Sequence, residues 1–278
     1  MRSKIWVGVG MVVVAGTAAS AQPIVAGAAG KVRVQSGWQV AAADTAKALP
    51  SGQGGEGGEA GAAATGEITD AGLSEKLAEL SAHIWLAQTL NSNGGGAEAA
   101  EVLTHALESI YPQVAPGLAS RQIAPLEAAL KSVLEAARKS VNGAKFDSAG
   151  LERQLMAADA VIAPKGAALA RHEAGVIVGL AKSASIEFGE AVVDGQIKAM
   201  AEYRLASAFV RAAIGRFKGV EAQLKDKSAV ATADIADGLS ALGASLNSLD
   251  ALPAVRLTPA QFSAIASRLE LKASRFTN

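Results

Sequence analysis

The chain has 278 residues, 50% of them hydrophobic, with 26 basic and 26 acidic side chains and no cysteine. Without cysteine, disulfides, thiolate metal sites, thiol nucleophiles and c-type haem attachment are all excluded. The balanced charge and the absence of a basic block argue against nucleic acid as a partner.

The N-terminus has the three parts of a secretory signal peptide. Arg2 and Lys4 give a positive n-region, residues 5–16 are an apolar run, and residues 19–21 (Ala-Ser-Ala) have the small side chains that signal peptidase recognises. The apolar run is shorter than the roughly 20 residues that span a bilayer. We therefore expect cleavage before Gln22, which leaves a periplasmic or secreted protein that is not integral to the membrane. An uncleaved peptide would instead tether it.

The segment after the predicted signal peptide (1–21) has little helical character. Residues 51–66 are rich in glycine and have no apolar periodicity, which is typical of a flexible linker. We therefore predict a poorly ordered N-terminal segment and Gly/Glu-rich linker over residues 22–67. A helical bundle domain is expected over residues 68–278.

From residue 68 onward the apolar residues recur with helical spacing, and turns rich in glycine or proline separate the periodic stretches. Short connections make consecutive helices antiparallel, so the predicted fold class is all-α, an antiparallel bundle of about 7–8 helices. Tyr111-Pro112 and Pro116-Gly117 are expected to end the second helix. The predicted helices span residues 70–90, 97–110, 125–141, 148–162, 167–193, 198–218 and 232–249, with a last one beginning at Thr258 and Pro259.

Two of the three histidines flank the first predicted glycine turn symmetrically. His83 and His105 are equidistant from residue 94, so in an antiparallel hairpin they lie at the same level, roughly 15 Å from the turn. Glu108 and Tyr111 follow His105 on the same helical face. Two imidazoles and a carboxylate can form a ligand set for a transition metal. Alternatively, the histidines satisfy each other or backbone groups between the helices.

In the hairpin predicted around Asp194-Gly195, two carboxylates flank the turn symmetrically, as the histidines flank the first turn. Glu187 and Glu202 are each about two helical turns from this bend. Glu190 and Asp194 continue a carboxylate stripe from Glu187. Paired carboxylates on facing helices are how bundles build metal sites, although the Glu-x-x-His motifs of a di-iron centre are missing. The alternative is a solvated acidic face.

A longer pattern surrounds these carboxylates. Residues 187–197 (Glu-Phe-Gly-Glu-Ala-Val-Val-Asp-Gly-Gln-Ile), followed by Glu202-Tyr203 and Phe209, resemble the extracytoplasmic helical domain of Ftr-type high-affinity iron permeases. The resemblance implies a stand-alone relative of that domain. Glu187 and Glu202 match its acidic positions, and the aromatic ones are matched by Phe188, Tyr203 and Phe209.

The sequence departs from this pattern at two points. Leu205 and Ala206 stand where the family usually has a second acid and a methionine. The Arg-Glu-x-x-Glu motif of the permease membrane helices is absent from the 278 residues.

Two functional hypotheses follow. In the first, the protein is a periplasmic, metal-associated accessory protein whose ion is iron or another transition metal and whose partner is a membrane permease or another envelope protein. In the second, it is a helical interaction or structural protein without a small ligand that docks on a membrane partner. Known catalytic motifs are absent, so no enzyme activity is predicted. The candidate metal ligands are Glu187, Glu190, Asp194 and Glu202 and, as a second set, His83, His105 and Glu108.

The two ligand sets predict different metal preferences. Iron(III) should prefer the carboxylates, and a softer divalent ion should prefer the imidazoles. Binding at the histidines is expected to weaken below about pH 6, because a protonated imidazole cannot ligate.

Limited proteolysis tests the predicted organisation. Cleavage is expected between residues 45 and 67, because a glycine-rich segment cannot bury enough apolar area to offset its ordering. The C-terminal fragment should stay intact. Mass spectrometry of the fragments is the measurement, and a resistant linker would contradict the prediction.

Overall fold

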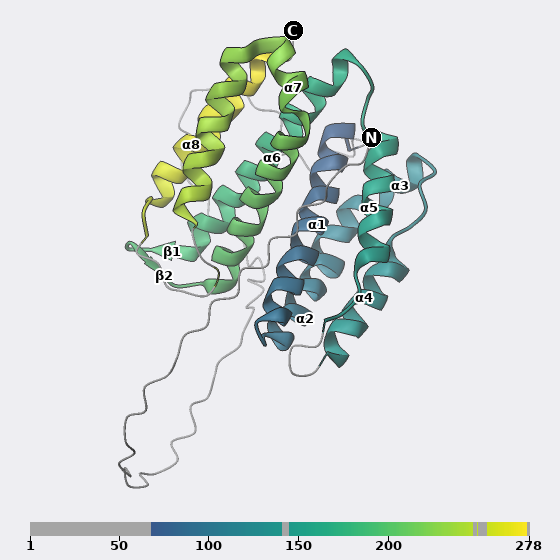
Figure 1. Ribbon diagram of the computed structural model, residues 1–278. Helices are drawn as coiled ribbons and strands as arrows, with labels where there is room; N and C mark the ends of the chain where they lie inside the picture. The colour runs from purple at the N-terminus through teal and green to yellow at the C-terminus, as the bar shows by residue number, and fades with distance from the viewer. Residues whose placement is uncertain (1–67, 141–144, 247–248, 250–254, 277–278) are drawn as a thin grey trace, which may run out of the picture. The chain divides into compact units, whose positions relative to one another are not determined.

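A computed structural model describes residues 68–140, 145–246, 249 and 255–276 (Figure 1). The predicted signal peptide and the segment 22–67 lie outside the described residues and stay predictions. The described part is almost entirely helical, which confirms the predicted all-α fold class.

The first half of the described chain packs around its first helix. Thr69 caps that helix, because its side chain accepts a hydrogen bond of 3.1 Å from the Gly72 N–H. The elements are α1 (Asp70–Ser92), α2 (Gly96–His105), the π-helical turn η1 (Ala106–Ile110), α3 (Tyr111–Ser120), α4 (Glu127–Lys139) and α5 (Ala149–Ile162).

The second half contains the longer helices. Its last helix begins with a full capping box between Thr258 and Gln261. The elements are α6 (Ala167–Ala191), the strands β1 (Val192–Val193) and β2 (Gln196–Ile197), α7 (Met200–Ser245), α8 (Pro259–Ala273) and the short 3-10 turn η2 (Ser274–Phe276).

The predicted end of the second helix is wrong. The helical path continues through Pro112 and Pro116 to Ser120. Pro112 falls in the first turn of α3, where its missing N–H leaves no helical bond unmade. The turn before it is widened to a π-helix, in which the Tyr111 N–H bonds to the Ala106 carbonyl.

Helix α7 bends back on itself at Ser228. That residue has φ −159° and ψ 95°, and its side chain accepts a hydrogen bond of 3.3 Å from the Ala231 N–H, as at the start of a new helix. A Cβ on Gly243 would lie 3.1 Å from the Ile214 side chain, and the two residues are almost equally far from the bend along the chain. The two arms are therefore antiparallel (Figure 1). The helix predicted over 198–218 extends to the bend at Ser228, and the one predicted over 232–249 begins directly after the bend and ends at Ser245.

A two-residue β-hairpin joins α6 to α7. Val192 pairs with Ile197 and Val193 with Gln196. Asp194 and Gly195 occupy the turn with φ of +51° and +71°, which is the geometry of a type I′ turn and explains the Asp-Gly pair. The pairing keeps Glu187 and Glu202 in the symmetric register predicted from the sequence.

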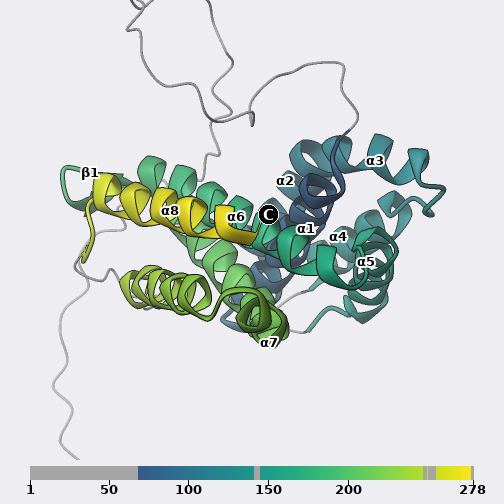
Figure 2. The same ribbon diagram turned by 90° about the horizontal axis from the view of Figure 1, so that it is seen from above.

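Helix α1 is the shared core of the described structure. It contacts α2, α3 and α5 on one side and α6 and α7 on the other, and α6 packs along both α7 and α8 (Figure 2). Its leucines and Ile84 are almost fully buried, and so are Glu79 and His83. The polar side chains of Glu79 and His83 therefore face protein rather than water.

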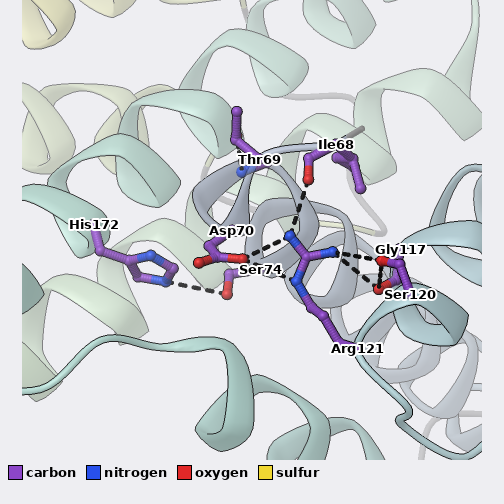
Figure 3. A network of polar contacts seen from close by, with 9 residues as sticks. Ile68, Thr69, Asp70, Ser74, Gly117, Ser120, Arg121 and His172 are labelled. Carbon is purple, nitrogen blue, oxygen red and sulfur yellow. Dashed lines mark hydrogen bonds and ion pairs between the residues drawn. The ribbon is translucent and has the colours of Figure 1, made fainter. Parts of the chain in front are cut away.

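Two polar contacts fix the start of α1 (Figure 3). Arg121, at the end of α3, donates to the Asp70 carboxylate at 2.6 and 2.9 Å and to the Ile68 carbonyl at 3.1 Å. His172 of α6 contacts the Ser74 hydroxyl at 3.1 Å. These contacts set the position of α1 between α3 and α6.

Within the described residues, none of the helices combines the length and apolar character that a membrane span requires.

The bend in α7 can be tested by removing its cap. Ser228→Ala is expected to lower the free energy of unfolding by about 1 kcal/mol, because the Ala231 N–H loses its acceptor. Ser228→Asp keeps an acceptor and should stay close to the parent. Urea unfolding followed by far-UV circular dichroism measures both, and equal stability of Ser228→Ala and Ser228→Asp would contradict the capping role.

Candidate metal centre

The two histidines of the first hairpin face each other as their spacing predicts. His83 lies on α1 and His105 at the end of α2, and their rings stack with centroids 5.4 Å apart and planes at 24°. The ring of Phe209, from α7, lies 5.5 Å from His83 on a tilted plane. The His83 ring thus contacts rings from two other helices, α2 and α7.

His83 has one ring nitrogen without a partner. Its Nδ1 lies 2.8 Å from the Glu79 carbonyl oxygen, so Nδ1 carries the hydrogen and donates it. Nε2, on the opposite side of the ring, is buried and has no hydrogen-bond partner. An unmet buried acceptor is costly. A backbone-anchored Nδ1–H with a free Nε2 lone pair is the arrangement of metal-ligating histidines.

Burial keeps this imidazole neutral. Desolvation lowers the pKa of His83 to about 4, and positive charge on His105 or Lys76 would lower it further, while the bond to the Glu79 carbonyl opposes the change. Burial also lowers the pKa of His105, and the charges of Glu79 and Glu202 partly oppose this change by raising the pKa. The Nε2 of His83 therefore stays unprotonated at pH values below 6, and the expected weakening of metal binding below about pH 6 stays a prediction.

The π-turn η1 begins directly after His105. Such insertions re-aim the side chains around them and are frequent at functional sites. Here Pro112 accounts for the widening, because a regular turn would press its ring against the Glu108 carbonyl. Glu108 itself lies on this turn and is exposed.

The carboxylates of the second hairpin act electrostatically on groups of the first. Burial raises the pKa of Glu187 to about 7, and the charges of Glu190, Glu202 and Glu79 act in the same direction. Glu79 lies on α1, whereas Glu187 is at the end of α6. Since Glu202 also acts on His105, the structure joins the two predicted ligand sets.

Arg204 holds the second hairpin near the first. It donates to the Glu98 carboxylate at the start of α2 at 2.5 Å and to the Leu249 carbonyl at 2.9 Å. Because Arg204 follows Glu202 by two residues, these bonds fix the start of α7 beside α2.

The sequence analysis missed two acidic residues of this centre. The Glu79 side chain is only 2% exposed, and it accepts bonds from Lys76 at 2.9 and 2.8 Å and from Ser183 of α6 at 2.7 Å. Burial raises the pKa of Glu75 to about 7, with the Glu79 charge adding to the effect. Gly179 leaves room for the Glu75 carboxyl, because a Cβ there would collide with it.

A signal for these residues is present in the sequence. Glu75, Glu79 and His83 recur at intervals of four, so they share one face of α1. The same segment has a strong leucine stripe, and the sequence analysis considered only this apolar face of the helix.

Other predicted ligands lie at the edge of the centre. Glu190 is exposed one turn beyond Glu187, and Asp194 is exposed at the tip of the β-hairpin. Across the described ranges, no three or more His, Asp or Glu side chains are grouped closely enough to hold a metal ion as they stand.

A separate buried charge cluster lies nearer the start of α6. Arg216 of α7 donates to Glu173 at 2.9 and 3.0 Å and to Asp159 of α5 at 2.6 Å. These bonds pair one guanidinium with two carboxylates, as expected of a structural ion pair between helices.

Comparison with known proteins supports the predicted relationship. Residues 165–277 match the iron permease-associated 4-helix bundle domain. This match confirms the resemblance seen around Glu187 and Glu202. The iron permease-associated domain corresponds to α6, the two arms of α7, and α8, which are four helices. No curated protein and no solved structure matched the chain.

The matched domain supplies only part of the centre. Glu187 and Glu202 lie within the iron permease-associated bundle. His83, His105 and Glu79 come from α1 and α2, outside the matched residues. The centre is therefore formed where the bundle meets the helices that precede it.

The raised pKa of Glu187 predicts a pH-dependent stability. Since its pKa is higher in the folded than in the unfolded state, its contribution to stability is fully present below about pH 4.5 and is lost as the pH rises through about 7. Glu187→Gln should therefore stabilise the protein at pH 8, on the order of 1 kcal/mol, and change little at pH 4.

Thermal unfolding at the two pH values measures this difference. Glu135→Gln, which changes an exposed carboxylate on α4, is the matched control and should have the same small effect at both. A Glu187→Gln effect that does not depend on pH would contradict the burial of this carboxyl.

Proposed function

We propose that the protein is an exported binding protein for a transition-metal ion, most directly iron, and that it serves a membrane permease or another envelope partner. It acts by binding rather than by turnover. The observation that carries the proposal is the buried, unpartnered Nε2 of His83, whose ring stacks against that of His105. The Glu202 carboxylate acts electrostatically on His105 and on Glu187.

The residue types around His83 suit a metal ion, although the described side chains would have to move closer together to hold one. Neutral imidazoles suit iron, copper and zinc, while carboxylates suit hard iron(III). Several carboxyl groups lie near one another here, and a bound cation would reduce the repulsion between their negative charges. Burial holds Glu187 and Glu75 at a pKa of about 7, so near neutral pH each carboxyl gives up its proton readily when a stronger positive charge enters.

The match to an iron permease-associated domain supports iron as the ion and a permease as the partner. Delivery or retention of iron outside the membrane would need a site that binds and releases. Carboxyls that exchange protons for metal near pH 7 provide such reversibility, since acidification favours release.

The proposal predicts metal binding with a defined division of roles. The chain without its predicted signal peptide should bind iron in calorimetric titration at micromolar concentration. Glu187→Ala/Glu202→Ala should weaken iron(III) binding at least about tenfold, whereas His83→Ala/His105→Ala should chiefly weaken copper(II) and zinc(II). Iron(III) affinity should fall as the pH drops below about 7, and copper(II) affinity should persist to lower pH.

The control is Glu127→Ala/Glu135→Ala, which removes two exposed carboxylates from α4 and should bind as the parent does. Far-UV circular dichroism confirms that each variant is folded. If the parent binds none of these ions, or if both double variants bind as tightly as the parent, the metal proposal is wrong. A helical interaction protein without a small ligand would then be the better hypothesis.

A further inference from the structure

We propose that the cavity between α1, α5 and α7 binds a small zwitterion, an α-amino acid with an apolar side chain. The ligand ammonium bonds to Asp159 of α5, and the ligand carboxylate bonds to Arg211 of α7. This site is separate from the proposed metal function, because none of the residues that line the cavity belongs to the candidate metal centre.

The cavity exists because α5 and α7 both pack on α1 but hardly contact each other. It has a volume of about 300 Å³, at the lower end of the range of about 300–1,000 Å³ that is usual for ligand pockets. Such a volume suits a ligand of amino-acid size.

Asp159 gives the cavity wall a hydrogen-bond acceptor without a donor. Its Oδ2 accepts from Arg216 at 2.6 Å, whereas its Oδ1 is buried and has no hydrogen-bond partner. The same guanidinium also binds both oxygens of Glu173, so two carboxylates share one cation. Burial lowers the pKa of His172, and although the charges of Glu173 and Asp159 oppose this change, the imidazole adds no positive charge near neutral pH. A ligand ammonium supplies both the donor and the charge.

Arg211 gives the same wall a positive charge that is open to a ligand. Its guanidinium lies 4.2 Å from the centre of the Trp85 ring and, within the described ranges, makes no ion pair. Stacking on an aromatic ring leaves the N–H groups at the edge of a guanidinium free to bind a carboxylate. Since Asp159 and Arg211 line one small cavity, a single molecule that carries both charges can reach them together.

Most of the remaining wall is apolar. The residues of this kind are Leu77, Ala78, Ala82, Leu155, Ala208 and Ala212. Gly215 adds space, because a Cβ on this residue would have no atom within 4 Å. Met156 also lines the cavity and is 71% exposed, so its flexible side chain can cover a bound apolar group. These walls favour an aliphatic ligand side chain over a polar one.

Three related probes test the two charges while every side chain of the cavity stays native. Calorimetric titration of the chain without its predicted signal peptide should show L-leucine binding with a Kd below about 1 mM. Isoamylamine lacks the carboxylate and isocaproate lacks the ammonium, so each should bind at least about tenfold more weakly than leucine. If leucine does not bind, or binds no better than either analogue, the proposal is wrong and water alone meets the Asp159 oxygen.

Variants place the binding in this cavity. Gly215→Leu fills the cavity from α7 and should weaken leucine binding at least about tenfold. The control is Gly219→Leu, one helical turn further along and outside the cavity wall, which should bind as the parent does. Arg211→Met should lose the preference for leucine over isoamylamine but keep the preference for leucine over isocaproate, a pattern that a general loss of structure would not give.

Far-UV circular dichroism shows whether each variant is folded. Equal leucine binding by folded Gly215→Leu and Gly219→Leu would overturn the proposal, and so would an unchanged preference in Arg211→Met. If Gly215→Leu fails to fold, the three probes on the parent and the preference of Arg211→Met still decide the question. The metal titrations are a separate experiment, so failure of this site leaves the proposed function standing.

Discussion

The buried carboxylate of Glu79 is the constraint around which the centre is organised. It lies between α1 and α6, where water cannot solvate it, so its oxygens need donors from the protein. Lys76 supplies charge from the same helix and Ser183 supplies a hydroxyl from the facing one. The packing of α1 against α6 and the electrostatics of the site thus depend on one group.

The negative charge of Glu79 acts on titratable groups of α1, α2 and α6. It adds to the raised pKa of Glu75 and Glu187, and it opposes the lowered pKa of His105. The carboxyls of Glu75 and Glu187 consequently exchange protons near neutral pH, while the imidazole of His83 stays neutral well below it. This order is the reverse of what the unperturbed pKa values of the side chains suggest.

The bundle related to iron permease domains packs against the helices that precede it. Residues 165–277 match the family domain, and they supply Glu187 and Glu202. Helices α1 and α2 bring imidazoles and a second pair of carboxylates against the same end of α6. Covering by these helices raises the electrostatic strength of every group enclosed.

The sequence by itself determined the helical fold class, most helix positions and the two symmetric pairs. These features follow from local rules: apolar spacing of 3.6 residues, glycine and proline at turns, and equal distances along the two arms of a hairpin. The helix end predicted at Pro112 was wrong, because a π-helical turn lets the helix continue past this residue. Only the tertiary structure decided that the two hairpins share one centre and that Glu75 and Glu79 belong to it. Contact between α1 and α6 joins residues about a hundred positions apart, which no local period encodes. Burial, and the pKa shifts that it causes, depends on what covers a side chain rather than on its neighbours in sequence.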